Sequence, residues 1–187
     1  MLVCLDPGHG GSDKGTHDSE GFWESRVAYT IAKKLESSLL GAGYITGFTR
    51  DPDHDPPLSR RQRHANDIGA DLFLSIHVNA SSNSKTDGTM CFYRRDPLAE
   101  RCARAIVEHS SLSHGNPLWP TDEAHEPGNG WLKRADNCLK MCQMPAILVE
   151  TGFRTSPVDR PYLLSKNGQR DMAAALFQAI QDCRSYA

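Results

Sequence analysis

Residues 72–77 read Leu-Phe-Leu-Ser-Ile-His. The apolar part of this stretch is short, and its flanks are glycine or polar residues, as is typical of a buried strand. Residues 2–5 and 146–149 show the same pattern. Because strands and helices alternate along the chain, the sequence predicts an α/β fold. We expect one mostly parallel central sheet of about six strands, flanked by helices on both faces.

Each of the three runs leads to a residue that can bind or serve a metal. His9 follows the first run, His77 ends the second, and Glu150 directly follows the third. Ligands of open α/β sheets gather beyond the carboxyl ends of the strands, so these side chains are expected to converge. With Glu24 they would supply two imidazoles and two carboxylates, which is the donor set of a zinc hydrolase.

Periodicity predicts the remaining elements. Apolar residues at intervals of three and four predict a first helix over 24–40, with Glu24 on its inward stripe. Residues 113–130 lack periodicity and are predicted to form one long surface loop. The other expected elements are strands at 44–49 and 89–93 and helices at 59–68, 97–109 and 169–183.

Length and composition restrict the class of protein. A chain of 187 residues is expected to form a single domain over 1–187. The net charge of -2 gives no global attraction for nucleic acid, so we expect no nucleic-acid partner. No apolar run has the length of a membrane span, and we expect no membrane insertion. The six cysteines are interpreted as small buried residues with reduced thiols.

Each candidate site residue also has a structural explanation. His9 lies in a Gly-rich turn, which alone is weak evidence for a ligand, and His77 could be a core histidine bonded to a carbonyl. Glu150 is the stronger signal because burying an unpaired carboxylate is costly, although a structural salt bridge is an alternative. Glu20 is the rival of Glu24 as a ligand, but it lies outside the helical stripe.

Several other residues invite a functional interpretation. Arg60, Arg61 and Arg63 form a basic cluster, which we interpret as a solvated helix face, with contact to an anionic substrate as the alternative. Trp119 and Trp131 flank the predicted loop and would either stack on substrate or pack that loop down. The loop histidines are expected to be solvent-exposed: His17, His114 and His125.

Ordered motifs cover nearly the whole chain. They are Leu-Asp-Pro-Gly-His-Gly-Gly at 5–11, Glu24 at its helix start, Gly-Ala-Asp-Leu-Phe-Leu-Ser-Ile-His-Val-Asn-Ala at 69–80, and Met-Pro-Ala-Ile-Leu-Val-Glu-Thr-Gly-Phe at 144–153. Together they resemble the zinc-dependent N-acetylmuramoyl-L-alanine amidases of the amidase 3 type. Several motifs in the right order are specific evidence where one alone would be weak.

The resemblance implies that His9, Glu24 and His77 hold one Zn²⁺ ion and that Glu150 is the catalytic carboxylate. It also implies hydrolysis of the amide between N-acetylmuramic acid and L-alanine in peptidoglycan. The residues agree with this, since two His and one Glu leave a coordination position open for water. Glu150 would move the proton from that water to the leaving amine, and Lys140 or Asn79 could help to hold the oxyanion.

Two other classes of function remain open. A zinc peptidase or deacetylase acting on another cell-wall substrate would use the same ligands, because loops set the substrate. A non-catalytic wall-binding module would have no need of Glu150. The chain also departs from the family pattern at Arg63, at His64 and at 87–90, where a glutamate is often found in relatives. These departures affect substrate contacts and leave the zinc residues intact.

The biological setting follows from the N-terminus. No signal-peptide pattern precedes the first predicted strand, so we expect synthesis in the cytoplasm and action on the cell wall. A phage endolysin in an infected host is preferred over an enzyme of a sporulating mother cell. We expect a monomer, and a wall-binding module missing from this chain remains an open alternative.

Overall fold

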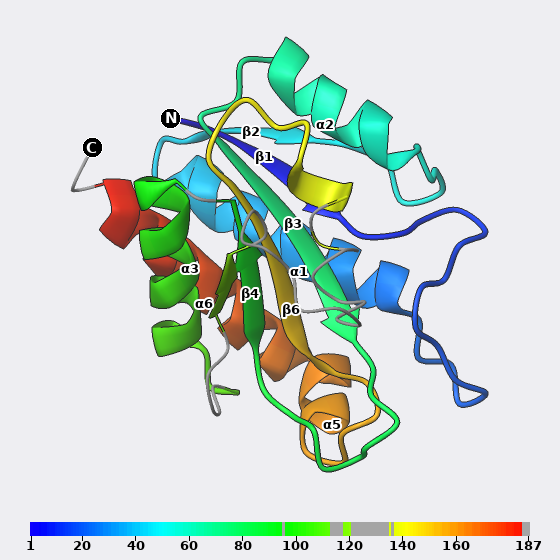
Figure 1. The fold of residues 1–187 in the computed structure, drawn as a ribbon. Helices are drawn as coiled ribbons and strands as arrows, with labels where there is room; N and C mark the ends of the chain where they lie inside the picture. The colour runs from blue at the N-terminus through cyan, green and yellow to red at the C-terminus, as the bar shows by residue number, and fades with distance from the viewer. Residues whose placement is uncertain (95, 113–117, 121–134, 136, 185–187) are drawn as a thin grey trace.

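The structure, a computed structural model, describes residues 1–94, 96–112, 118–120, 135 and 137–184, with the backbone alone at 118–120. The strands form one six-stranded sheet in the order β2-β1-β3-β6-β4-β5 (Figure 1). Their bounds are β1 Leu2–Pro7, β2 Ile45–Phe48, β3 Leu72–Asn79, β4 Met90–Tyr93, β5 Leu118–Pro120 and β6 Ala146–Phe153.

The sheet is mostly parallel, as predicted. Strand β1 lies between β2 and β3, and β3 pairs with β6, all in parallel. Strand β4 pairs with β6 in the antiparallel sense and with β5 in parallel. The β3–β6 register places His77 opposite Glu150 and shifts between His77 and Asn79. Irregular pairing of this kind often occurs beside functional sites.

Helices cover both faces of the sheet, which confirms the predicted fold class (Figure 1). Helices α1, α3 and α6 pack on one face, against residues such as Leu74 and Val149. On the other face Ala65 of α2 packs with Phe73 and Leu148. The helix bounds are α1 Glu24–Gly41, α2 Leu58–Asp67, α3 Pro97–His109, α5 Asp159–Leu164 and α6 Lys166–Arg184.

The two-residue period of a strand decides which side chains can reach the site. In β3, Leu74 and Ile76 face the α1 side, and in β6 Ile147 and Val149 do so. The alternate positions, which include His77 and Glu150, therefore face the side that carries α2. Both strands extend further than the sequence predicted. His77 was expected to end its strand and Glu150 to follow its apolar run, but both residues lie inside strands.

The prediction of one loop over 113–130 was wrong in part. Its residues 118–120 form strand β5, which pairs with β4 through the backbone. A three-residue strand is too short to give a periodic signal. The rest of that segment, with His114 and His125, lies outside the described residues, as does Trp131. Helix α5 was not predicted either.

Two expectations from composition can be compared with the structure. The six cysteines are free thiols, and all except Cys142 are buried. Within the described part of the chain, the structure contains no helix with the length and apolar character needed to cross a membrane.

Candidate metal centre

The turn after β1 aims His9, and two buried arginines hold that turn. Arg50 donates to the carbonyl oxygens of Pro7 (2.8 Å) and Gly8 (3.0 Å). Arg61 donates to the carbonyl oxygens of Pro7 (2.9 Å) and His9 (2.8 Å). His9 itself has a φ of 57°, in the left-handed region that a non-glycine residue rarely adopts. These bonds to carbonyls stabilise a backbone conformation that would otherwise be unfavourable.

The basic cluster of Arg60, Arg61 and Arg63 is not wholly a solvated helix face, because Arg61 is buried. Its side chain is only 3% exposed and pairs with Asp6 at 3.0 Å and Asp55 at 2.8 Å. Asp6 also accepts hydrogen bonds from Thr49 and Ser75. Although burial would raise the pKa of Asp6, the guanidinium of Arg61 and these hydroxyls outweigh it and lower that pKa. Arg61 is therefore a buried structural cation, whereas Arg60 and Arg63 are exposed.

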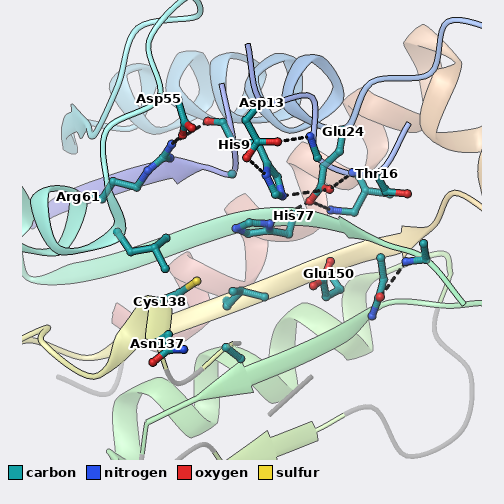
Figure 2. A pocket seen from close by; sticks show the side chains of 18 of the residues that line it. His9, Asp13, Thr16, Glu24, Asp55, Arg61, His77, Asn137, Cys138 and Glu150 are labelled. Atoms are coloured by element: carbon teal, nitrogen blue, oxygen red, sulfur yellow. Dashed lines mark hydrogen bonds and ion pairs between the residues drawn. The ribbon is translucent and has the colours of Figure 1, made fainter. Parts of the chain in front are cut away.

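Three donor side chains meet beside this turn (Figure 2). Ligand atoms of His9, Glu24 and His77 all lie within 4.8 Å of one another. Glu24 Oε2 lies 3.2 Å from His9 Nε2, and Glu24 Oε1 lies 2.9 Å from His77 Nδ1. The two imidazole rings meet edge to face, with centroids 5.2 Å apart. The structure thus brings together the three residues that the sequence proposed as ligands.

Backbone groups fix the position of Glu24. The N–H groups of Thr16 and Val78 donate to its two carboxylate oxygens, at 2.7 Å and 3.0 Å. Glu24 is the first residue of α1, where the partial positive charge of the helix terminus favours a carboxylate. Asp13 Oδ2 lies 2.7 Å from His9 Nδ1 and orients the ring so that Nε2 faces Glu24.

Electrostatics favours positive charge at this cluster. Burial alone would raise the pKa of Glu24, but hydrogen bonds to His77 and His9 hold its pKa well below the usual range. Burial alone would lower the pKa of His9, but Glu24 and Asp13 outweigh it and raise the pKa to about 9. The pKa of His77 is also raised against the effect of burial, by Glu24 and then Glu150. An ionised, buried carboxylate between two imidazoles is a suitable environment for a cation.

Glu150 faces the same cavity as this cluster. The cavity has a volume of about 730 Å³, and His9, Glu24, His77 and Glu150 all line it. Figure 2 shows Glu150 on the strand next to that of His77. Its lining also includes apolar residues such as Pro57, Leu58 and Leu148. The cavity therefore combines the donor cluster, a further carboxylate and space for a substrate chain.

The other candidates lie elsewhere or have other partners. Glu20 is exposed and pairs with Arg160 at 2.8 Å. His17 lies 2.9 Å from the carbonyl oxygen of Gly15 through Nδ1 and is exposed. Lys140 is exposed and donates to Oδ1 of Asn137, a residue that lines the cavity. Asn79 lines the cavity, and its Oδ1 accepts the N–H of Ala80.

Known proteins resemble this chain over most of its length. The family model described as N-acetylmuramoyl-L-alanine amidase matches residues 3–182. The chain belongs to this amidase family. Its sequence is 42% identical to the amidase AmiA of Salmonella typhimurium, over 96% of this chain and 74% of AmiA. It is 32% identical to the amidase LytC of Bacillus subtilis, over 96% of this chain but only 34% of LytC.

The fold agrees with that of solved amidase structures. The amidase AmiC2 of Nostoc punctiforme superposes with a TM-score of 0.84 at 30% identity, over 99% of this chain and 97% of AmiC2. The amidase-family fold therefore spans the chain, including the strands that carry the candidate site.

Sequence reasoning missed the residues that support the site of this amidase-family chain. Asp13 and Thr16 contact His9 and Glu24 directly, and Arg50 holds the turn before them. Asp13 stands four residues after His9 in the Gly-rich segment, a spacing that could have suggested contact. Thr16 carries no such signal, because its backbone N–H makes the bond to Glu24 and any residue except proline supplies one.

Gly8→Ala tests how closely the turn packs on the donor cluster. A Cβ at Gly8 would lie 2.3–2.6 Å from three ring atoms of His77, so the ring would have to move. We expect zinc affinity to fall by about tenfold or more, as for other changes next to metal ligands. Titration against a chromophoric chelator measures this. Gly41→Ala, whose Cβ would meet nothing within 4 Å, is the control, and equal affinities in the two variants would contradict the prediction.

Proposed function

We propose that this chain is a zinc-dependent amidase that hydrolyses the bond between N-acetylmuramic acid and L-alanine in peptidoglycan. One observation carries the proposal: the donor atoms of His9, Glu24 and His77 converge within 4.8 Å in the cavity that Glu150 also lines. Family membership supports the choice of substrate, and relatives such as LytC and AmiA are named for this activity.

The donor set fits zinc. Two imidazoles and one carboxylate are typical of catalytic zinc sites, in which a fourth position stays open. His9, Glu24 and His77 would hold the ion. When bound, zinc supplies a Lewis acid that polarises the amide carbonyl and lowers the pKa of a water molecule.

Glu150 is proposed as the group that moves the proton. Its carboxylate lies on the same side of the sheet as His77, at the paired position of the adjacent strand. From there it can accept a proton from the attacking water and donate it to the departing amine of L-alanine. Asp13 keeps the ring of His9 oriented, and Arg61 keeps the preceding turn in place by bonding its carbonyls.

A zinc peptidase or deacetylase remains the second candidate because it would use the same residues. The cavity of about 730 Å³ is lined by apolar as well as polar residues and has space for substrates other than a muropeptide. Action on the cell wall is proposed from the family. Three further expectations remain predictions. They are the setting in an infected host or a mother cell, the monomeric state and the presence of a wall-binding module.

Digestion of purified peptidoglycan separates these candidates. The zinc-loaded protein is expected to release new N-terminal L-alanine without new reducing sugars, as identified by mass spectrometry of the soluble products. A sample treated with chelator and a sample with zinc restored serve as controls. New termini inside the stem peptide, or loss of acetyl groups alone, would show that the amidase assignment is wrong.

A further inference from the structure

We propose that Arg154 is a specificity residue that binds a carboxylate of the stem peptide, on the second residue after the scissile amide. This inference rests on the proposed amidase function and goes beyond it, because it concerns how the peptide is selected. The observation behind it is a guanidinium at the edge of the cavity, most of whose donors have no partner among the described residues.

Arg154 lies between two segments that line the cavity. It directly follows β6, the strand that carries Glu150, and its backbone N–H donates to the carbonyl oxygen of Asn79 at 2.8 Å. Its side chain crosses to the loop between β1 and α1, where Nε donates to Thr16 Oγ1 at 2.7 Å. Thr16 and Asn79 both line the cavity. The guanidinium is therefore anchored at the edge of the cavity.

In the part of the chain that the structure describes, the other donors of Arg154 have no partner. The Nε–H is the only guanidinium donor that has a hydrogen-bond partner among the described residues, and no described carboxylate pairs with this cation. The side chain is partly exposed. A guanidinium keeps its charge and presents paired donors that match the two oxygens of a carboxylate. Because Nε is already held by Thr16, little side-chain freedom would be lost on binding.

The neighbouring arginine differs in this respect. Arg160 lies at the same loop, but its Nε and Nη2 donate to Asp18 Oδ2 at 3.0 Å and 2.9 Å, and Nη2 also donates to Glu20 at 2.8 Å. Its charge is thus balanced within the protein. Arg160 provides a matched comparison for Arg154, with a similar position but with its carboxylate partners already present.

The link between Arg154 and the donor cluster suits the chemistry of the substrate. Two hydrogen bonds, through the side chain and the backbone N–H of Thr16, link the Arg154 guanidinium to the carboxylate of Glu24. An extended peptide advances about 3.3–3.6 Å per residue, so the second residue of the stem lies roughly 7 Å beyond the scissile amide. In peptidoglycan that residue is D-glutamate joined through its γ-carboxyl, which leaves the α-carboxylate free or amidated. A free carboxylate there would be the partner that Arg154 does not find among the described residues.

The test compares two synthetic substrates, N-acetylmuramoyl-L-alanyl-D-glutamate peptides with the α-carboxylate free or amidated. The zinc-loaded wild type is expected to show a kcat/KM about tenfold higher for the free acid, the effect of one charge-assisted hydrogen bond. Arg154→Gln is expected to remove this preference, with the loss confined to the free acid. Arg154→Lys should retain part of it. Zinc content, measured for each variant, checks that Thr16 still supports Glu24.

The controls distinguish an error in the inference about Arg154 from an error in the proposed amidase function. Arg160→Gln is expected to leave the ratio between the two substrates unchanged. If Arg154→Gln slows both substrates equally, Arg154 only holds the Thr16 loop and the inference is wrong. Equal cleavage of both substrates by the wild type would also overturn the inference while leaving the amidase function intact. Cleavage of neither substrate would overturn the proposed function itself, and the inference with it.

Discussion

Glu150→Gln is expected to keep its zinc and to lose about 10²–10⁴-fold in kcat on peptidoglycan, the range for removal of a general base or acid. Glutamine preserves the size of the side chain but cannot accept and return a proton at neutral pH. Glu150 is not part of the His9, Glu24 and His77 donor group, so metal binding should be unaffected. Turnover of a soluble muropeptide and zinc content by atomic absorption measure the two effects on the same sample.

The control for this variant is Glu108→Gln, which changes an exposed glutamate on α3 in the same way. It should match the wild type in both measurements. If Glu150→Gln retains wild-type activity, the proton is moved by another group and the role proposed for Glu150 is wrong. If it loses zinc together with activity, Glu150 belongs to the metal centre and not beside it.

His77→Ala is expected to abolish stoichiometric zinc binding and, as a result, activity. The substitution removes one of three protein donors and leaves Glu24, which is 3% exposed, without its 2.9 Å contact to the ring. The loss of affinity should exceed about 100-fold, the upper end for changes that only support a ligand. Isothermal titration with zinc measures the affinity, and thermal unfolding with and without zinc gives a second readout.

The unfolding measurement distinguishes a variant that has lost zinc binding from one that has lost its folded structure. A ligand at 100 times its Kd adds about 2.7 kcal/mol to the free energy of unfolding. The wild type and His54→Ala, a change at an exposed histidine, should both gain this stabilisation from zinc. His77→Ala should remain folded without zinc and gain little from it. An equal gain in His77→Ala would mean that the ion binds elsewhere.

The elements that the sequence predicted best are those with strong periodicity. The helix over 97–109 was predicted with the bounds that the structure shows, and the helix from Glu24 ends one residue later than expected. The ends of β3 and β6 were placed too early because the prediction stopped where the apolar run stopped. Backbone pairing continues through polar residues, and pairing depends on the neighbouring strand and not on the hydropathy of the strand itself.

The candidate site also contains residues that the sequence could identify and others that it could not. His9, Glu24, His77 and Glu150 could be named from the sequence because chemically able side chains stood at strand ends or at a helix start. Arg61 could not be interpreted correctly, since an arginine on a polar helix has the same local pattern whether it is solvated or buried. Its burial depends on Asp6, which is 55 residues away in the chain.

The sequence by itself determined the fold class, the three parallel strands at the centre of the sheet, and the identity of the four side chains proposed for the chemistry. These follow from local patterns of apolar and polar residues, which decide what each segment can bury. The tertiary structure alone decided the geometry. It brings three donors within 4.8 Å of one another and supports them with Asp13, Thr16 and Arg61. It also places the Arg154 guanidinium beside Thr16, with only Nε bonded among the described residues. Contacts of this kind depend on distances between segments far apart in the chain, and a local pattern carries no information about such distances.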